Sequence, residues 1–330
     1  MPHIGNYEFD EIIGRGRFGR VYKGIHNSTG EYVAIKLEDK RDEHKLLEEA
    51  EFLKNIGKIC NHVPEILQTG NSIRWNYMIM SFLGPNLEEL FIYCGRNFSL
   101  KTTLLLTLQV LDTIKEVHAS GIIHRDIKPD NFVMGFGETH NKLFLIDFGL
   151  AITYINSDMQ HKEYEHKTQF TGTGRYSSLT NHQGIQQSRR DDLESIGYML
   201  IYFLKGKLPW QNIPPLKPKN KMEKLQKLKN IHKKKESCDI NELCEGCPSE
   251  FKQYIIYCRK LGYKEKPDYS YIRQLFRKVM KRHGYRNDKI FDWDTNNEEE
   301  KAEMVRRIQN IKNVKIQKAY KRLGNNTTPT

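Results

Sequence analysis

The stretch Gly121-Ile122-Ile123-His124-Arg125-Asp126-Ile127-Lys128-Pro129-Asp130-Asn131 brings three chemically useful side chains into one short loop. The carboxylate of Asp126 could accept or orient the proton of an attacking hydroxyl. Lys128 could offset negative charge that grows on a phosphate, and Asn131 could reach a metal ion from the same loop. The spacing of these residues therefore predicts a catalytic loop.

A second motif, Asp147-Phe148-Gly149, follows the apolar run 143–146. Its carboxylate would be a metal ligand like Asn131, because Mg²⁺ prefers a few oxygen ligands together with phosphate. Each tripeptide alone could arise by chance in a loop. In this order, with the asparagine in register, the two motifs resemble the H-R-D-x-x-x-x-N and D-F-G motifs of protein kinases. The resemblance implies ATP and Mg²⁺ as cofactors.

Residues 7–37 are expected to form strands around a glycine-rich motif. The motif is Gly14-Arg15-Gly16-Arg17-Phe18-Gly19-Arg20-Val21, and Tyr32-Val33-Ala34-Ile35-Lys36 follows it. A dinucleotide-binding unit would place a helix after the glycines and an acid about 20 residues further on. Here strand-forming residues follow instead, so the motif is interpreted as a flap over ATP, as in kinases. Glycine lets backbone N–H groups approach phosphate oxygens closely.

Lys36 would hold the α- and β-phosphates; the alternative is a solvent-facing lysine on a strand. Residues 43–56 have helical periodicity. The apolar face of this helix carries Leu46, Glu49, Ala50 and Leu53. An acid on an inward face needs a cation, so we predict that Glu49, rather than Glu48 or Glu51, pairs with Lys36.

A strand at Met78-Ile79-Met80 ends in Ser81-Phe82-Leu83-Gly84-Pro85. Because Gly-Pro breaks a strand, we expect a hinge here whose backbone groups could hold adenine. The residues expected to contact ATP are Ile13, Gly14, Arg15, Gly16, Arg17, Phe18, Gly19, Arg20, Val21, Ala34, Lys36, Met80, Ser81 and Leu83.

The expected fold is α+β: a bilobal protein-kinase fold with a small antiparallel-sheet lobe carrying one main helix, and a larger helical lobe. The expected ranges are 1–6 for an N-terminal segment, 7–295 for the kinase domain (small lobe 7–80, hinge 81–85, large lobe 86–295) and 296–330 for a basic extension. Leu104, Leu108 and Leu111 predict a buried helix that ends near Gly121, and Ile196, Leu200 and Phe203 one after Asp192. The expected amphipathic helix of the extension carries Met304, Val305, Ile308 and Ile311, and would either pack on the domain or stay partly ordered. Residues 325–330 are expected to be disordered.

The composition, 38% hydrophobic and 28% charged over 330 residues, is ordinary for a soluble globular protein. No apolar run approaches the ~20 residues of a membrane span, so we expect no transmembrane segment. Six cysteines do not make a disulfide scaffold, which favours a reducing compartment such as the cytoplasm. Cys244-Glu245-Gly246-Cys247 could belong to a zinc site, but no second C-x-x-C pairs with it.

The net charge is +12, and the segment Lys217–Lys235 holds nine lysines against one acid, Glu223. This excess favours anionic partners, or it belongs to a solvated loop and helix. No zinc-finger, RRM or KH signature accompanies it, so we expect no specific nucleic acid partner. The lysine-rich segment would also permit residence in the nucleus.

The motifs after the D-F-G indicate which family of protein kinases the chain resembles, because the A-P-E found in most protein kinases is missing. They are Thr171-Gly172-Thr173-Gly174-Arg175-Tyr176-Ser177-Ser178-Leu179-Thr180, Ser188-Arg189-Arg190-Asp191-Asp192-Leu193-Glu194-Ser195, Leu208-Pro209-Trp210-Gln211, Pro267-Asp268-Tyr269-Ser270-Tyr271-Ile272-Arg273-Gln274-Leu275-Phe276 and Phe291-Asp292-Trp293. Together with Leu83-Gly84-Pro85-Asn86-Leu87-Glu88, they resemble the casein kinase 1 family over about residues 5–295. The vaccinia-related branch tends to lose the H-R-D-x-K-P form found here.

The resemblance implies a serine/threonine kinase, expected to be a monomer, whose protein substrates are acidic or phosphorylated before the target residue. It also implies activity without phosphorylation of the activation loop, and an anion pocket formed by Arg175 and Lys221. The chain departs from the family at Ser178-Leu179-Thr180, where S-I-N is usual, and at Gly174, where alanine is expected. The flap is also more basic than usual, through Arg15, Arg17 and Arg20.

A competing hypothesis from another class is a pseudokinase scaffold that presents its basic surface to partners. A scaffold would be free to lose any of the catalytic positions. The chain keeps Lys36, Asp126, Asn131 and Asp147, which favours the enzyme.

Overall fold

The structure is a computed structural model that describes residues 2–16, 19–41, 45–166, 168–216 and 219–323. The chain divides into two compact units. The first comprises Met1–Tyr93, Phe132–Gly149 and Trp293–Thr330, and the second comprises Cys94–Asn131 and Leu150–Asp292. A curled antiparallel sheet characterises the first and a helical bundle the second, so the predicted α+β bilobal kinase fold is confirmed.

The first unit is built on a six-stranded sheet in the order β1-β2-β3-β4-β6-β5. Its strands are β1 (His3–Ile4), β2 (Tyr7–Gly16), β3 (Gly19–His26), β4 (Tyr32–Asp39), β5 (Ile66–Asn71) and β6 (Trp75–Ser81). Strand β4 follows the two-residue period: Val33, Ile35 and Leu37 pack in one core cluster with Phe9 and Tyr22. The alternate residues, Lys36 and Glu38 among them, therefore lie on the opposite face of the sheet.

Helix α1 (Leu46–Gly57) belongs to that opposite face. The carboxylate of Glu38, 1% exposed, accepts hydrogen bonds from the backbone N–H of Lys45 at 3.1 Å and of Leu46 at 3.2 Å. A strand side chain thus satisfies orphan N–H groups at the start of the helix, which fixes where the helix begins. The helix then buries Leu46, Glu49, Ala50, Leu53 and Ile56.

Two further segments complete this unit around residues 81–85, the predicted hinge. Helix α2 (Leu87–Tyr93) follows the hinge, and strands β8 (Phe132–Met134) and β9 (Leu143–Leu145) pair with each other, with the short 3₁₀ helix η2 (Gly137–Thr139) between them. The hinge backbone is fixed to β8: Gly84 N–H donates to Met134 O at 2.8 Å, and Met134 N–H donates to Pro85 O at 2.9 Å.

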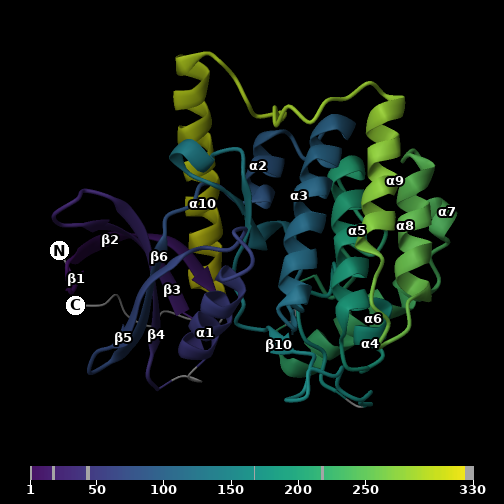
Figure 1. Cartoon of the computed structure of the whole chain (residues 1–330), viewed down its shortest axis with the longest axis horizontal. Coiled ribbons are helices and arrows are strands. Elements are labelled where there is room, and N and C mark those ends of the chain that lie inside the picture. The colour runs from purple at the N-terminus through teal and green to yellow at the C-terminus, as the bar shows by residue number, and fades with distance from the viewer. Residues whose placement is uncertain (1, 17–18, 42–44, 167, 217–218, 324–330) are drawn as a thin grey trace. The chain divides into compact units, whose positions relative to one another are not determined.

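Helix α10 (Glu298–Leu323) packs on α2 and β2, within the first unit (Figure 1). Lys312 lies 3.9 Å from the Glu89 carboxylate, and the side-chain N–H of Gln309 donates to Glu11 at 2.7 Å. Ile308 is buried, but Val305 is 63% exposed, so its place in the predicted apolar stripe is wrong. At about 100° per residue, Met304, Ile308 and Ile311 lie within about 60° of one another around the helix, whereas Val305 lies about 100° from Met304 and outside that stripe. Residues 325–330 lie outside the described part of the chain.

The second unit is a helical bundle. Its elements are α3 (Leu100–Ala119), β7 (Ile122–Ile123), η1 (Pro129–Asn131), β10 (Ile152–Thr153), α4 (Leu179–His182), α5 (Arg189–Lys205), α6 (Lys221–Glu236), α7 (Ile240–Leu243), α8 (Ser249–Lys260) and α9 (Tyr269–Arg282). Helices α3, α5, α8 and α9 pack side by side (Figure 1). Helix α5 was expected after Asp192, but it begins at Arg189, which places Asp191 and Asp192 in its first turn.

No helix among the described residues is both long enough and apolar enough to span a membrane. The six cysteines all lie among the described residues, and none of them forms a disulfide.

Candidate active site

The first unit brings Lys36, Glu49 and Asp147 together. The Lys36 ammonium lies 2.8 Å and 2.7 Å from the two Glu49 carboxylate oxygens and 3.2 Å from Asp147 Oδ1. Lys36 is 6% exposed and Glu49 2%. Burial alone would lower the pKa of Lys36, but the two carboxylates outweigh it and hold the pKa above its usual value. The lysine is therefore a cation held between strand β4 and helix α1.

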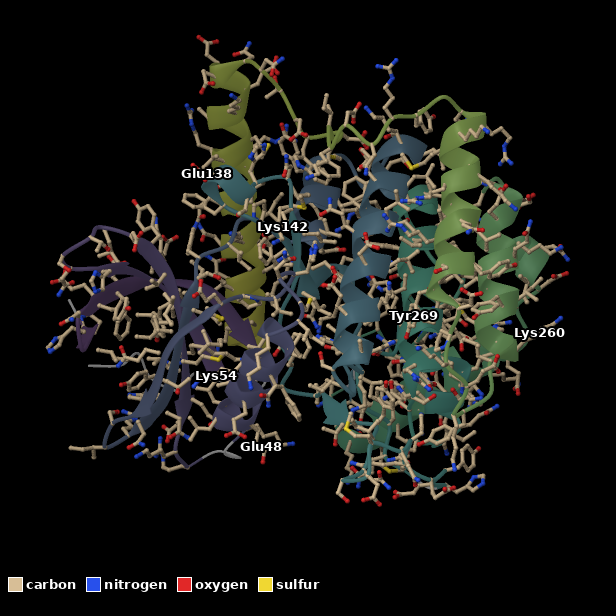
Figure 2. All side chains as sticks on the ribbon, viewed as in Figure 1. Glu48, Lys54, Glu138, Lys142, Lys260 and Tyr269 are labelled. Atoms are coloured by element: carbon tan, nitrogen blue, oxygen red, sulfur yellow. The ribbon has the colours of Figure 1, made fainter. Side chains whose placement is uncertain are left out.

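The helical periodicity identified the right acid on α1. Glu49 faces β4, while Glu48 and Glu51 are exposed, and Figure 2 shows Glu48 on the outer side of the helix. The predicted pair with Lys36 is present. Its role in catalysis stays a prediction.

Asp147 stands in an uncommon backbone conformation, with φ of 65°. Such a conformation in a residue other than glycine persists only where the surrounding structure holds it. The next side chain, Phe148, is fully buried and anchors the motif. Because the Asp147 side chain is still 36% exposed, its carboxylate could serve as a metal ligand.

The glycine-rich motif is a hairpin between β2 and β3, with Arg15 paired across from Arg20 and Gly16 from Gly19. Gly19 has φ of 133°, and a Cβ there would lie 2.2 Å from Leu37 O, so only glycine fits. The two facing arginines concentrate positive charge near the tip. Arg17 and Phe18, also predicted to contact ATP, lie outside the described residues.

The remaining predicted ATP contacts also lie in the first unit: Ile13 and Gly14 on β2, Val21 on β3, Ala34 on β4, and Met80, Ser81 and Leu83 at the end of β6 and in the hinge. Ala34 is paired with Met80 across the sheet. Their contact with nucleotide stays a prediction.

The second unit positions Asp126 through three side chains. Thr173 Oγ1 donates to Asp126 Oδ1 at 2.7 Å, and the Lys128 ammonium lies 2.5 Å from Oδ2. The Asn131 amide donates to the Asp126 backbone carbonyl at 2.8 Å, which fixes the loop between them. Asp126 is 7% exposed, so these bonds determine how its carboxylate is oriented.

A buried acid that the sequence analysis missed, Asp192, holds this loop. Its carboxylate accepts hydrogen bonds from the backbone N–H of His124 at 2.8 Å and of Arg125 at 2.9 Å, and lies 3.0 Å from His118 Nε2. Burial raises the pKa of Asp192, but the bonds from His118 and the loop outweigh it and lower the pKa. His118 is held in turn by the Tyr269 hydroxyl, 2.7 Å from Nδ1.

A signal for Asp192 was present in the sequence. Two adjacent acids come shortly before the mostly apolar run 196–204, and an acid buried beside such a run must find donors. Thr173 carried no such signal, because a threonine in a turn is common and its partner lies 47 residues away.

The predicted anion pair, Arg175 and Lys221, also belongs to the second unit. The Arg175 guanidinium lies 5.7 Å from the ring centre of Tyr176 and 5.6 Å from that of Tyr202. Lys221 is the exposed first residue of α6. These contacts show a packed arginine and a solvated lysine, and the anion pocket stays a prediction.

Among the residues described, no group of three or more histidine, cysteine or acidic side chains is arranged to hold a metal ion. A magnesium ion would need fewer protein ligands than that, since phosphate and water complete its shell.

Comparison with known families agrees with this geometry. A family model described as the protein kinase domain matches residues 7–282 of the 330. The chain belongs to the protein kinase domain family. Membership supports protein kinase activity, with ATP and typically Mg²⁺ as cofactors and proteins as substrates. The buried lysine–glutamate pair and the oriented aspartate both lie within the matched residues.

We expect Glu49→Gln to lower phosphoryl-transfer turnover about tenfold or more, because Lys36 would lose a charged hydrogen bond worth roughly 1.5–3 kcal/mol. Steady-state kinetics of the three glutamine variants on α1 would measure this. Glu48→Gln and Glu51→Gln are matched controls on the exposed face and should stay near wild type. A larger loss in either control would show that Glu49 is not the partner that matters.

Proposed function

We propose that the chain is a serine/threonine protein kinase of casein kinase 1 type. It would transfer the γ-phosphate of ATP to serine or threonine hydroxyls in acidic or phosphate-primed proteins. The observation that carries the proposal is Asp126, a carboxylate held by Thr173 and Lys128 on a loop that is itself fastened to Asp192. Such a group is pre-oriented to accept a hydroxyl proton.

Each unit would contribute distinct chemistry. Lys36, fixed by Glu49, would bind the phosphates of ATP, and the flap and hinge backbone would hold the rest of the nucleotide. Lys128 would offset charge on the transferred phosphoryl group. Asp147 and Asn131 offer the oxygen ligands that Mg²⁺ prefers, and the ion would neutralise phosphate charge when bound.

The segment that replaces A-P-E is compatible with the assignment to casein kinase 1, although it departs from the family pattern at Thr180. Ser178 and Thr180 both donate hydrogen bonds to the buried Asp191 carboxylate, Ser178 at 2.5 Å. The threonine found where that family usually has asparagine is thus compatible with a firmly anchored segment. The low cysteine content and basic charge also fit a monomer in the cytoplasm, with the segment 217–235 permitting entry to the nucleus.

The scaffold hypothesis is less favoured by these contacts. A scaffold has no need for a buried lysine–glutamate pair or for an aspartate with both carboxylate oxygens bonded.

Asp126→Asn should retain binding of Mg·ATP but lose turnover by ~10²-fold or more, the scale of general-base contributions. Phosphate transfer to an acidic protein, with wild type and variant side by side, measures the turnover, and nucleotide titration measures binding. Equal transfer rates in the two proteins would refute the proposed function.

Arg175→Ala should reduce kcat/KM for a phosphate-primed peptide about tenfold or more, and for the matched unprimed peptide much less. A phosphoserine carries about −1.5 to −2 charge, and each charged hydrogen bond to it contributes roughly 1.5–3 kcal/mol. Lys221→Ala should act in the same direction, and added salt should narrow the difference between the peptides.

The contacts of Arg175 with Tyr176 and Tyr202 define the opposing outcome. If both peptides lose activity by the same factor in Arg175→Ala, the residue supports its loop and the anion pocket is wrongly assigned.

A further inference from the structure

One lysine of the lysine-rich segment is wholly buried. Lys235, near the end of α6, has 0% exposure, while Lys234 beside it is exposed. Burying an ammonium group is unfavourable unless it is paired or hydrogen-bonded. The groups that contact Lys235 therefore indicate which part of the structure it stabilises.

Lys235 is enclosed by two aromatic rings and one backbone carbonyl. Its ammonium lies 4.9 Å from the ring centre of Tyr198 and 5.0 Å from that of Trp210. It also donates a hydrogen bond to the carbonyl oxygen of Ser177. Ring faces attract a cation most strongly when water is excluded, as it is here.

Trp210 acts on the same segment in the same way. Its indole N–H donates to the carbonyl of Arg175 at 2.6 Å. Two alternate carbonyls, those of Arg175 and Ser177, therefore accept hydrogen bonds from the interior of the second unit. The lysine and the tryptophan also contact each other, so they form one anchor.

The anchored segment is a compact turn that ends at the Asp126 carboxylate. The backbone N–H groups of Tyr176 and Ser177 donate to Thr173 O at 3.0 Å and 3.1 Å, and the Ser177 hydroxyl donates to the same oxygen at 3.0 Å. Thr173 then donates through its side chain to Asp126 at 2.7 Å. A displacement of the Ser177 carbonyl would thus be transmitted to Thr173 through three hydrogen bonds.

The start of the turn has little freedom to adjust. Gly172 has φ of 101°, and a Cβ there would lie 2.4 Å from the carbonyl oxygen of Arg125. The turn is thus packed against the catalytic loop at Gly172, and Lys235 holds its other end at Ser177.

We propose that Lys235 is a positioning residue for phosphoryl transfer: with Trp210 it holds the turn 173–177 so that Thr173 orients Asp126. The inference rests on the proposed function, because it assumes that Asp126 handles the substrate proton. It assigns a role in catalysis to a lysine that touches neither substrate nor nucleotide.

The charge of Lys235 gives this role a pH signature. Burial lowers the pKa of Lys235 to about 7. The negative charge of Glu194 opposes this shift, and the positive charge of Arg259 adds to it. Tyr198 and His182 also face the ammonium group. The protonated form makes the stronger bond to Ser177 and the contact with both rings. The advantage that Lys235 gives should therefore be larger at pH 6 than at pH 9.

The test compares Lys235→Met with Lys234→Met. Methionine fills similar space but has no charge and no donor, and the exposed neighbour controls for loss of positive charge on α6. We expect Lys235→Met to lower kcat about tenfold, the effect of losing one charged hydrogen bond, with Mg·ATP affinity unchanged. Lys234→Met should match wild type, and the ratio of wild-type to Lys235→Met kcat should shrink from pH 6 to pH 9.

Trp210→Phe keeps a ring beside Lys235 and removes only the donor to Arg175, so it serves if Lys235→Met does not fold. It should lower kcat severalfold and speed amide exchange at Tyr176 and Ser177. A wild-type kcat in Trp210→Phe, or in a folded Lys235→Met, would overturn the inference.

Asp126→Asn, assayed in parallel, distinguishes failure of the positioning role of Lys235 from failure of the proposed function. Its inactivity beside a fully active Lys235→Met would contradict only the positioning role. An active Asp126→Asn would contradict the proposed function itself.

Discussion

The buried carboxylate of Asp192 is the constraint on which the second unit's chemistry depends. It accepts two consecutive backbone N–H groups, those of His124 and Arg125, and faces His118. Arg125 has φ of 66°, an unfavourable conformation that the structure must hold. Hydrogen bonds to a charged group contribute roughly 1.5–3 kcal/mol each, enough to offset about 1–3 kcal/mol of backbone strain. These hydrogen bonds therefore hold the loop in one conformation directly before Asp126.

In the first unit a buried carboxylate again fixes another part of the structure, but there the group that it fixes is positively charged. There the group that is held is a cation, Lys36, and the holding group is again a buried carboxylate, Glu49. Removing one member of such a buried pair leaves an uncompensated charge. Both acids lie in the first turn of a packed helix, where the helix dipole favours a negative charge. In each unit a helix carries the acid, and a strand or loop carries the group that it fixes.

Features that depend on residues close together in the chain could be predicted from the sequence, whereas contacts between distant residues could not. Motif order predicted the bilobal fold, and helical periodicity separated Glu49 from Glu48 and Glu51, since both depend on short spacings. Asp192, Thr173 and Lys235 were missed as functional because their partners lie far along the chain, and Lys235 was hidden among eight other lysines of its segment. The misplacement of Val305 on α10 shows the limit of periodicity, because an apolar residue beside a stripe is not part of it.

The central claim is that a buried carboxylate fixes the loop that carries Asp126. It is tested most directly by the single-turnover rate of phosphate transfer from Mg·ATP to a serine peptide in Asp192→Asn. Asparagine keeps the side-chain shape but loses the charge and one acceptor oxygen. The account predicts a rate about tenfold or more below wild type with a much smaller change in Mg·ATP affinity, because Lys36, the flap and the hinge, which are proposed to bind the nucleotide, lie in the other unit. A rate within about twofold of wild type would contradict it.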